Sequence, residues 1–203
     1  MRSVHALPAA LVAALLLQSA VRAIIVVPAP KDVERALKLA QAPEPQRAAF
    51  HKPYVLHPDH PELEQLDAIT EYRRYVLTAE EQLRMGNWLF AQSVQAAQEK
   101  LKPWRERLTL IARLRFHPQN VLIGIPSYEI ALGDPELAPL SLTRAPINAL
   151  RSGRRGDFNA PLVGAVLEAA FNSSMIGQTA RPAILSLDGK PVASVTIDFA
   201  KLE

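Results

Sequence analysis

The chain has 203 residues, 23 basic and 20 acidic side chains, a formal net charge of +3 and no cysteine. The missing thiols exclude disulfides, thiolate metal ligands, cysteine nucleophiles and a lipid-modified cysteine anchor. The near-neutral charge argues against nucleic acid as a partner, because nucleic-acid binders carry a strongly basic domain.

The first 23 residues have the layout of a secretory signal peptide. Arg2 provides a positive start, residues 6–17 are apolar, and Val21 and Ala23 occupy the −3 and −1 positions of a cleavage site. A second interpretation retains the segment as an anchor, because residues 6–27 are long enough to cross a hydrocarbon core of about 30 Å. No later run is that long, so no integral membrane domain is expected beyond this anchor.

Residues 24–60 are expected to form an extended, Pro-rich segment that contains one short helix. Residues 31–41 place apolar side chains at helical spacing, and five prolines follow in residues 42–61. Apolar side chains then recur every three or four positions over residues 61–102, which predicts one long helix or a helical hairpin. Gly86 and Asn87 favour a kink or a turn within that run.

From Pro103 onward, apolar side chains recur at every second position instead of every third or fourth. Residues 108–116 alternate as a half-buried strand does, and further strands are expected over residues 121–132 and 140–147. A helix is expected over residues 161–175, followed by a hairpin around Asp188-Gly189.

Short links between the expected strands predict antiparallel pairing. The predicted fold class is therefore α+β, with a mainly antiparallel sheet of about five strands, helices on one face and one further helix. Residues 61–203 are expected to form a single α+β domain.

His57, Asp59 and His60 bring three metal-capable side chains into four residues. Zinc needs three or four ligands that converge, and the prolines at positions 58 and 61 hold this segment extended. We therefore expect no metal and no other cofactor, with these three residues as the candidates if a metal binds. His117 and His60 are the candidates for acid–base catalysis, although no nucleophile elbow or phosphate loop accompanies them.

The middle of the chain is the most basic part. Residues 82–155 carry 11 basic and five acidic side chains, and both flanking segments carry more acids than bases. Arg113 and Arg115 are expected on one face of a strand, and Arg151, Arg154 and Arg155 lie in a Gly-containing loop. Together they predict an anion-binding surface, and the alternative is a solvated face without a ligand.

These observations favour an exported binding or scaffolding domain of the cell envelope, periplasmic or secreted, over an enzyme. Its partner would be an envelope protein or an anionic surface. One alternative is a periplasmic hydrolase that uses the His57/Asp59/His60 region or His117. Another is a membrane-tethered assembly factor, if the leader is retained. Converging histidines and carboxylates in an apolar pocket would favour the enzyme, whereas an exposed apolar groove without them would favour the binding domain.

Overall fold

The computed structural model describes residues 27–133, 136–148, 162–177 and 179–203, and within them the predicted α+β class is confirmed. The helices are α1 (Pro30–Ala40), α2 (Glu44–His51), α3 (Glu71–Arg84) and α4 (Val94–Leu101). The strands are β1 (Val55–Leu56), β2 (Leu63–Ile69), β3 (Arg107–Arg115), β4 (Tyr128–Leu132), β5 (Ser141–Asn148), β6 (Leu162–Asn172), β7 (Ala180–Leu187) and β8 (Lys190–Asp198). None of the described helices is long and apolar enough to span a membrane.

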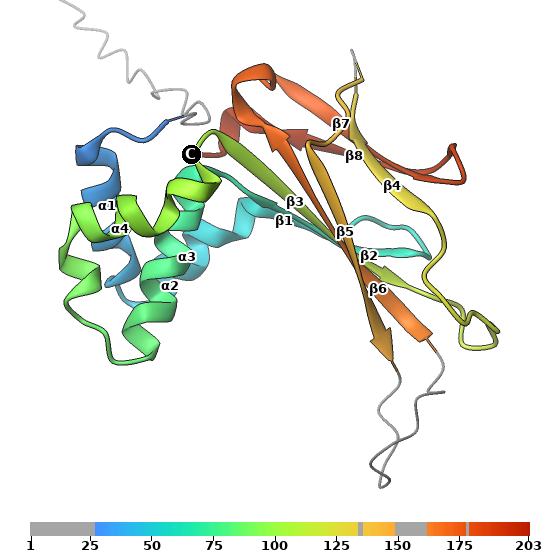
Figure 1. Cartoon of the computed structure of the whole chain (residues 1–203), viewed down its shortest axis with the longest axis horizontal. Helices are drawn as coiled ribbons and strands as arrows, with labels where there is room; N and C mark the ends of the chain where they lie inside the picture. The colour runs from blue at the N-terminus through green and yellow to red at the C-terminus, as the bar shows by residue number, and fades with distance from the viewer. Residues whose placement is uncertain (1–26, 134–135, 149–161, 178) are drawn as a thin grey trace, which may run out of the picture.

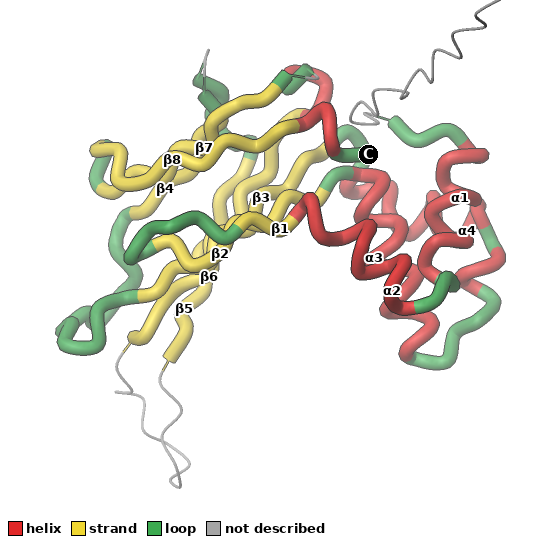
Figure 2. The backbone as a smooth tube through the Cα atoms, turned by 180° about the vertical axis from the view of Figure 1, so that it is seen from behind, coloured by secondary structure: helices red, strands yellow, loops and turns green. Residues whose placement is uncertain are grey.

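The strands form two antiparallel sheets rather than one. The larger sheet has the order β1-β2-β3-β6-β5, and the smaller has the order β4-β7-β8. Buried side chains from both sheets share one apolar cluster, so the two sheets form a sandwich. The helices were expected to cover one face of the sheet, but they gather at one end of the sandwich (Figures 1 and 2).

β3 carries the core of the larger sheet. Leu108, Leu110, Ala112 and Leu114 are buried on one side, as the alternation predicts, and Arg113 and Arg115 are exposed on the other. β3 pairs with β6 over nine residues, from Arg107 opposite Asn172 to Arg115 opposite Gly164.

The helices enclose a second apolar cluster of their own, to which α1, α3 and α4 contribute buried side chains. Thr70 is the N-cap of α3, and its hydroxyl accepts a hydrogen bond from the Arg73 amide at 3.2 Å. After the last helical residue, Arg84, Gly86 has a φ of +81°. The predicted interruption of the helical run therefore lies at Gly86.

Three expected elements are wrong. Residues 63–69 form β2 instead of the start of a helix, because a bulge between Leu63 and Gln65 breaks the two-residue period. Residues 44–51 form α2, because Pro43 and Pro45 lie at the start of a helix, where proline is tolerated. The helix expected over residues 161–175 is largely strand β6, with a short 3-10 turn at Ser173–Met175.

β6 resembles a helix in sequence because it is apolar along most of its length. Its less buried face carries Gly164, Val166 and Ala170 as well as the exposed Glu168, so the residue types hardly alternate as they do in other half-buried strands. The second expected strand is present only as Tyr128–Leu132. The hairpin at Asp188-Gly189 is confirmed, and it belongs to the smaller sheet.

All four tyrosines are buried, which predicts an unusual alkaline titration. Burial raises the pKa of Tyr54, Tyr75 and Tyr128 to about 12, and it also raises the pKa of Tyr72. Phenols ordinarily ionise near pH 10, so the stability that these residues contribute is complete below that pH and is lost as the pH approaches about 12. We expect phenolate absorbance to appear abruptly above about pH 11, together with loss of circular dichroism. Gradual ionisation near pH 10 in a folded chain would contradict this packing.

Candidate functional site

The predicted metal-binding and catalytic residues do not come together into one site in the structure. His57 and Asp59 are exposed in the link before β2, and His60 Nδ1 accepts hydrogen bonds from the amides of Glu62 and Leu63. His117 is exposed in a turn, where its Nδ1 accepts from the Gln119 amide at 3.2 Å. Within the part of the chain that the structure describes, no three histidine or carboxylate side chains are grouped to hold a metal ion.

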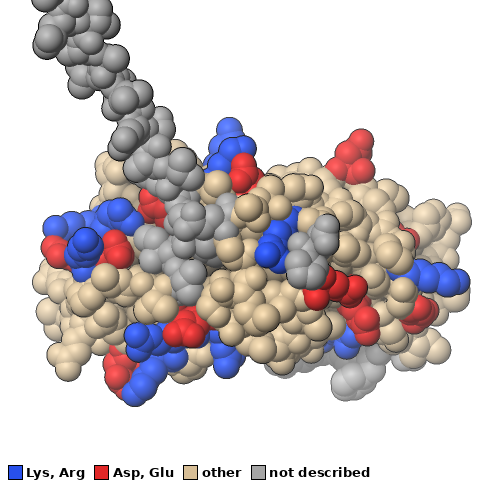
Figure 3. Space-filling view, turned by 90° about the horizontal axis from the view of Figure 1, so that it is seen from above, with Lys and Arg blue, Asp and Glu red and all other residues tan. Residues whose placement is uncertain are grey.

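The predicted anion surface is only partly described. Arg113 and Arg115 lie on the same side of β3, and Arg113 Nε pairs with Glu64 at 3.1 Å. Arg115 forms no ion pair with a residue that the structure describes. Arg151, Arg154 and Arg155 lie outside the described residues. On the face that Figure 3 presents, acidic and basic side chains are interspersed among uncharged ones.

A chain of charged side chains that sequence reasoning missed connects the larger sheet to the helices. Arg73, in the first turn of α3, is only 3% exposed and pairs with Asp67 of β2. Arg73 Nη1 also donates to the Ala68 carbonyl at 2.7 Å, and Arg73 Nε donates to His51 Nδ1 at 3.3 Å. A buried guanidinium needs such partners, because an unpaired buried charge is strongly destabilising.

The contacts of His51 determine its tautomer. A guanidinium can only donate, so His51 Nδ1 is the acceptor and the ring proton is on Nε2. His51 Nε2 donates to the Glu80 carboxylate, at 3.2 Å from each oxygen, and Arg47 Nη1 lies 3.3 Å from Glu80 Oε1. Both ring nitrogens are therefore engaged within the fold, which favours a structural role for His51 over that of a general base.

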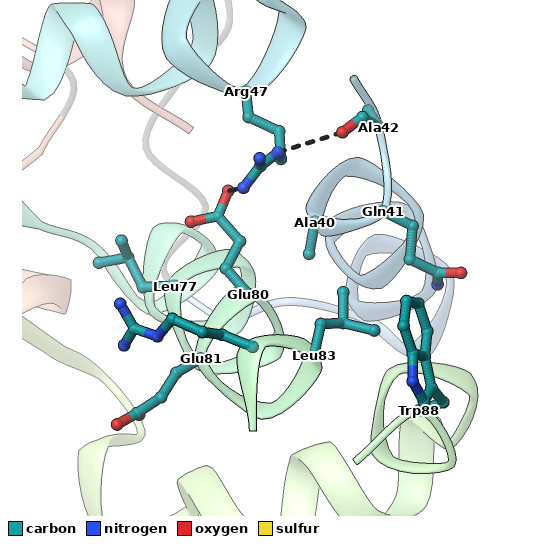
Figure 4. A pocket seen from close by; sticks show the side chains of 10 residues that line it. Ala40, Gln41, Ala42, Arg47, Leu77, Glu80, Glu81, Leu83 and Trp88 are labelled. Atoms are coloured by element: carbon teal, nitrogen blue, oxygen red, sulfur yellow. Dashed lines mark hydrogen bonds and ion pairs between the residues drawn. The ribbon is translucent and has the colours of Figure 1, made fainter. Parts of the chain in front are cut away.

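Glu80 and Arg47 line an open groove of about 660 Å³ where α1, α2 and α3 meet (Figure 4). Its other charged lining residues are Glu81 and Arg84, which are exposed and form no ion pair with a described residue. Its apolar lining comprises Ala40, Ala42, Leu77, Leu83 and Trp88. A second open groove, of about 710 Å³, lies between α1 and α2 and shares Ala42 with the first.

The turn that follows α3 is tightly held. The Gly86 amide donates to the Leu83 carbonyl at 3.0 Å, and the backbone amide and the side-chain amide of Asn87 each donate to Gln82 at 2.8 Å. Gln41 Nε2 bonds to the carbonyl of Ala91, which ties α1 to the segment after the turn. The geometry of residues 85–89 is therefore defined by the fold.

This turn presents three large apolar side chains to solvent. The exposed fractions are 62% for Met85, 63% for Trp88 and 80% for Leu89. We call these three residues the apolar knob. Single exposed apolar residues are ordinary on protein surfaces, but here three lie within five positions and one of them lines a groove.

The groove was not predicted, because the residues that line it come from three helices and the turn after α3. The structure places Trp88 at the groove. An open groove with an apolar lining, charged neighbours and an exposed tryptophan can bind another macromolecule. Comparison of the chain with protein-family models, with curated proteins and with solved structures finds no match.

Proposed function

We propose that this chain is a non-catalytic binding domain of the cell envelope, and that it holds an amphipathic segment of a partner protein in the groove between α1, α2 and α3. The observation that carries the proposal is Trp88, which is 63% exposed and lines that groove beside Leu83. Tryptophan and arginine are enriched among the residues that dominate binding at protein interfaces.

The chemistry of the groove favours a protein as its occupant. The carboxylates of Glu80 and Glu81 oppose a polyanion such as nucleic acid or a sulfated polymer. Glu81 and Arg84 provide one charge of each sign that pairs with no described residue, so a complementary segment would carry both signs beside its apolar face. Amphipathic helices bind apolar grooves in this way.

A hydrolase is the weaker proposal for this chain. His60 and His117 accept hydrogen bonds from backbone amides in separate loops, and His51, which lies close to the groove, uses both of its ring nitrogens. General acid–base catalysis requires a ring nitrogen that can reach the substrate. None of the described histidines combines such a nitrogen with an apolar pocket.

Replacement of Trp88 tests the binding proposal. In extracts of the cells that make the protein, we expect the wild-type chain to sediment faster than a monomer and Trp88→Ala to sediment more slowly than wild type. Leu140→Ala is the control, because Leu140 is 62% exposed but lies next to β5, outside the groove. Equal sedimentation of all three chains would count against the groove.

Export is proposed on the sequence of residues 1–23 alone, which lie outside the described residues. The expected result is a mature chain that begins at Ile24, because Val21 and Ala23 suit the peptidase. Mass spectrometry of protein purified from its own cells measures this directly. A chain that begins at Met1 would favour the membrane-tethered assembly factor.

A further inference from the structure

A second exposed apolar site lies at the opposite end of the molecule from the helices. The link between β3 and β4 extends beyond the larger sheet there (Figure 1), and we call its residues 117–126 the tip. Val121 is 91% exposed and Ile123 is 102% exposed. These are the most exposed large apolar side chains in the described part of the chain.

The exposure of Val121 and Ile123 is imposed by the fold of the tip. Leu122 and Ile125 are partly buried and pack against the sandwich core. Asn120 Nδ2 donates to the carbonyls of His117 and Leu162, at 2.7 and 2.9 Å, and Asn120 Oδ1 accepts from the Leu122 amide at 3.0 Å. Residues 121 and 123 therefore point away from the core while their neighbours hold the loop.

Among the described residues beside the tip, one cation has no acidic partner. Arg115 ends β3, is exposed and pairs with no described acid. Arg113 is compensated by Glu64, and Glu62 accepts a hydrogen bond from the Tyr128 hydroxyl at 3.0 Å. A protruding apolar loop next to a guanidinium that pairs with no described acid has the chemistry of a membrane-surface contact, in which aliphatic groups enter the acyl boundary and arginine binds phosphate.

We propose that the tip binds the surface of a phospholipid bilayer, with Val121 and Ile123 inserted among the acyl chains and Arg115 on an anionic headgroup. The contact uses a different surface from the partner groove and does not depend on it. A bilayer suits the tip better than a protein groove does, because lipid accommodates two fully exposed side chains without a matching cavity. One cation and two aliphatic side chains give weak, reversible binding.

Sedimentation with vesicles of phosphatidylglycerol and phosphatidylcholine tests this proposal. We expect the wild-type chain to bind at low salt, and Ile123→Ser to bind about tenfold more weakly because the buried aliphatic area is lost. Arg115→Ala should bind more weakly and with less salt dependence, whereas Arg113→Ala should change little. Leu89→Ser is the control, because Leu89 is 80% exposed at the other end of the molecule.

A second measurement locates the inserted residue. Ile123→Trp should shift its emission to shorter wavelengths when vesicles are added, and Leu89→Trp should not. No vesicle binding by the wild-type chain, or equal binding by Ile123→Ser, would overturn the proposal. Wild-type binding to heparin that matches its binding to vesicles and is unaffected by Ile123→Ser would assign Arg115 to an acidic polymer instead. None of these outcomes depends on Trp88, so the groove is tested separately.

Discussion

Replacing Arg73 with Met should lower the free energy of unfolding by about 3–5 kcal/mol, the usual cost of removing one partner from a buried ion pair. The substitution keeps an apolar stem but leaves the Asp67 carboxylate and the Ala68 carbonyl without their donor. His51 also loses the guanidinium that holds its tautomer. Urea unfolding followed by circular dichroism measures the difference.

Two further variants identify the cause. Arg47→Met should cost less than about 1 kcal/mol, because the Arg47–Glu80 pair is partly solvated. Adding Asp67→Asn to Arg73→Met should recover part of the loss, because it removes the uncompensated charge. If Arg73→Met is as stable as wild type, the buried pair contributes nothing and the link between sheet and helices depends on apolar contacts alone.

Gly164→Ala should be comparably destabilising, for a steric reason. A Cβ atom at residue 164 would lie 2.2 Å from the Leu114 carbonyl oxygen, so β3 and β6 would have to separate at the end of their pairing where Gly164 lies opposite Arg115. The clash involves backbone, which cannot rotate away. We expect a loss of at least about 3 kcal/mol, which lowers the melting temperature by roughly 10 °C in a chain of this size.

Gly124→Ala is the matched control, because a Cβ atom there meets nothing within 4 Å. Its stability should stay within about 0.5 kcal/mol of wild type, as for other surface substitutions. If Gly164→Ala melts at the same temperature as Gly124→Ala, the close approach of β3 and β6 is wrong.

The sequence predicts the elements of this fold well where apolar residues keep one regular spacing along a whole segment. α1, β3 and the hairpin at Asp188-Gly189 follow directly from helical spacing, alternation and turn chemistry. β2 and β6 do not, because a bulge hides the alternation of β2, and β6 carries apolar or small residues on both of its faces. The division of the strands into two sheets depends on contacts between segments that are distant in sequence. A local sequence pattern cannot predict such contacts.

The candidate sites, too, were predicted from the sequence only in part. Alternation places Arg113 and Arg115 on the solvent side of β3, but it cannot show that Glu64 neutralises only one of them. Arg73 lies next to Tyr72 on the side of α3 that packs against the rest of the fold, and a charged residue at such a position is a signal of a buried partner. Nothing in the sequence connects Trp88 with Ala40 and Arg47 across the groove.

The groove beside Trp88 is proposed to hold a partner protein. Site-specific photo-crosslinking can detect that partner, with an aromatic photoreactive residue in place of Trp88, which keeps the aromatic surface that Trp88→Ala removes. The control carries the same residue in place of Leu140, which is equally exposed elsewhere. We predict one discrete adduct from position 88 in intact cells, heavier than the 22.3 kDa chain, and none from position 140. No adduct from position 88, or the same adducts from both positions, would contradict the proposal that this chain binds a partner through its helical groove.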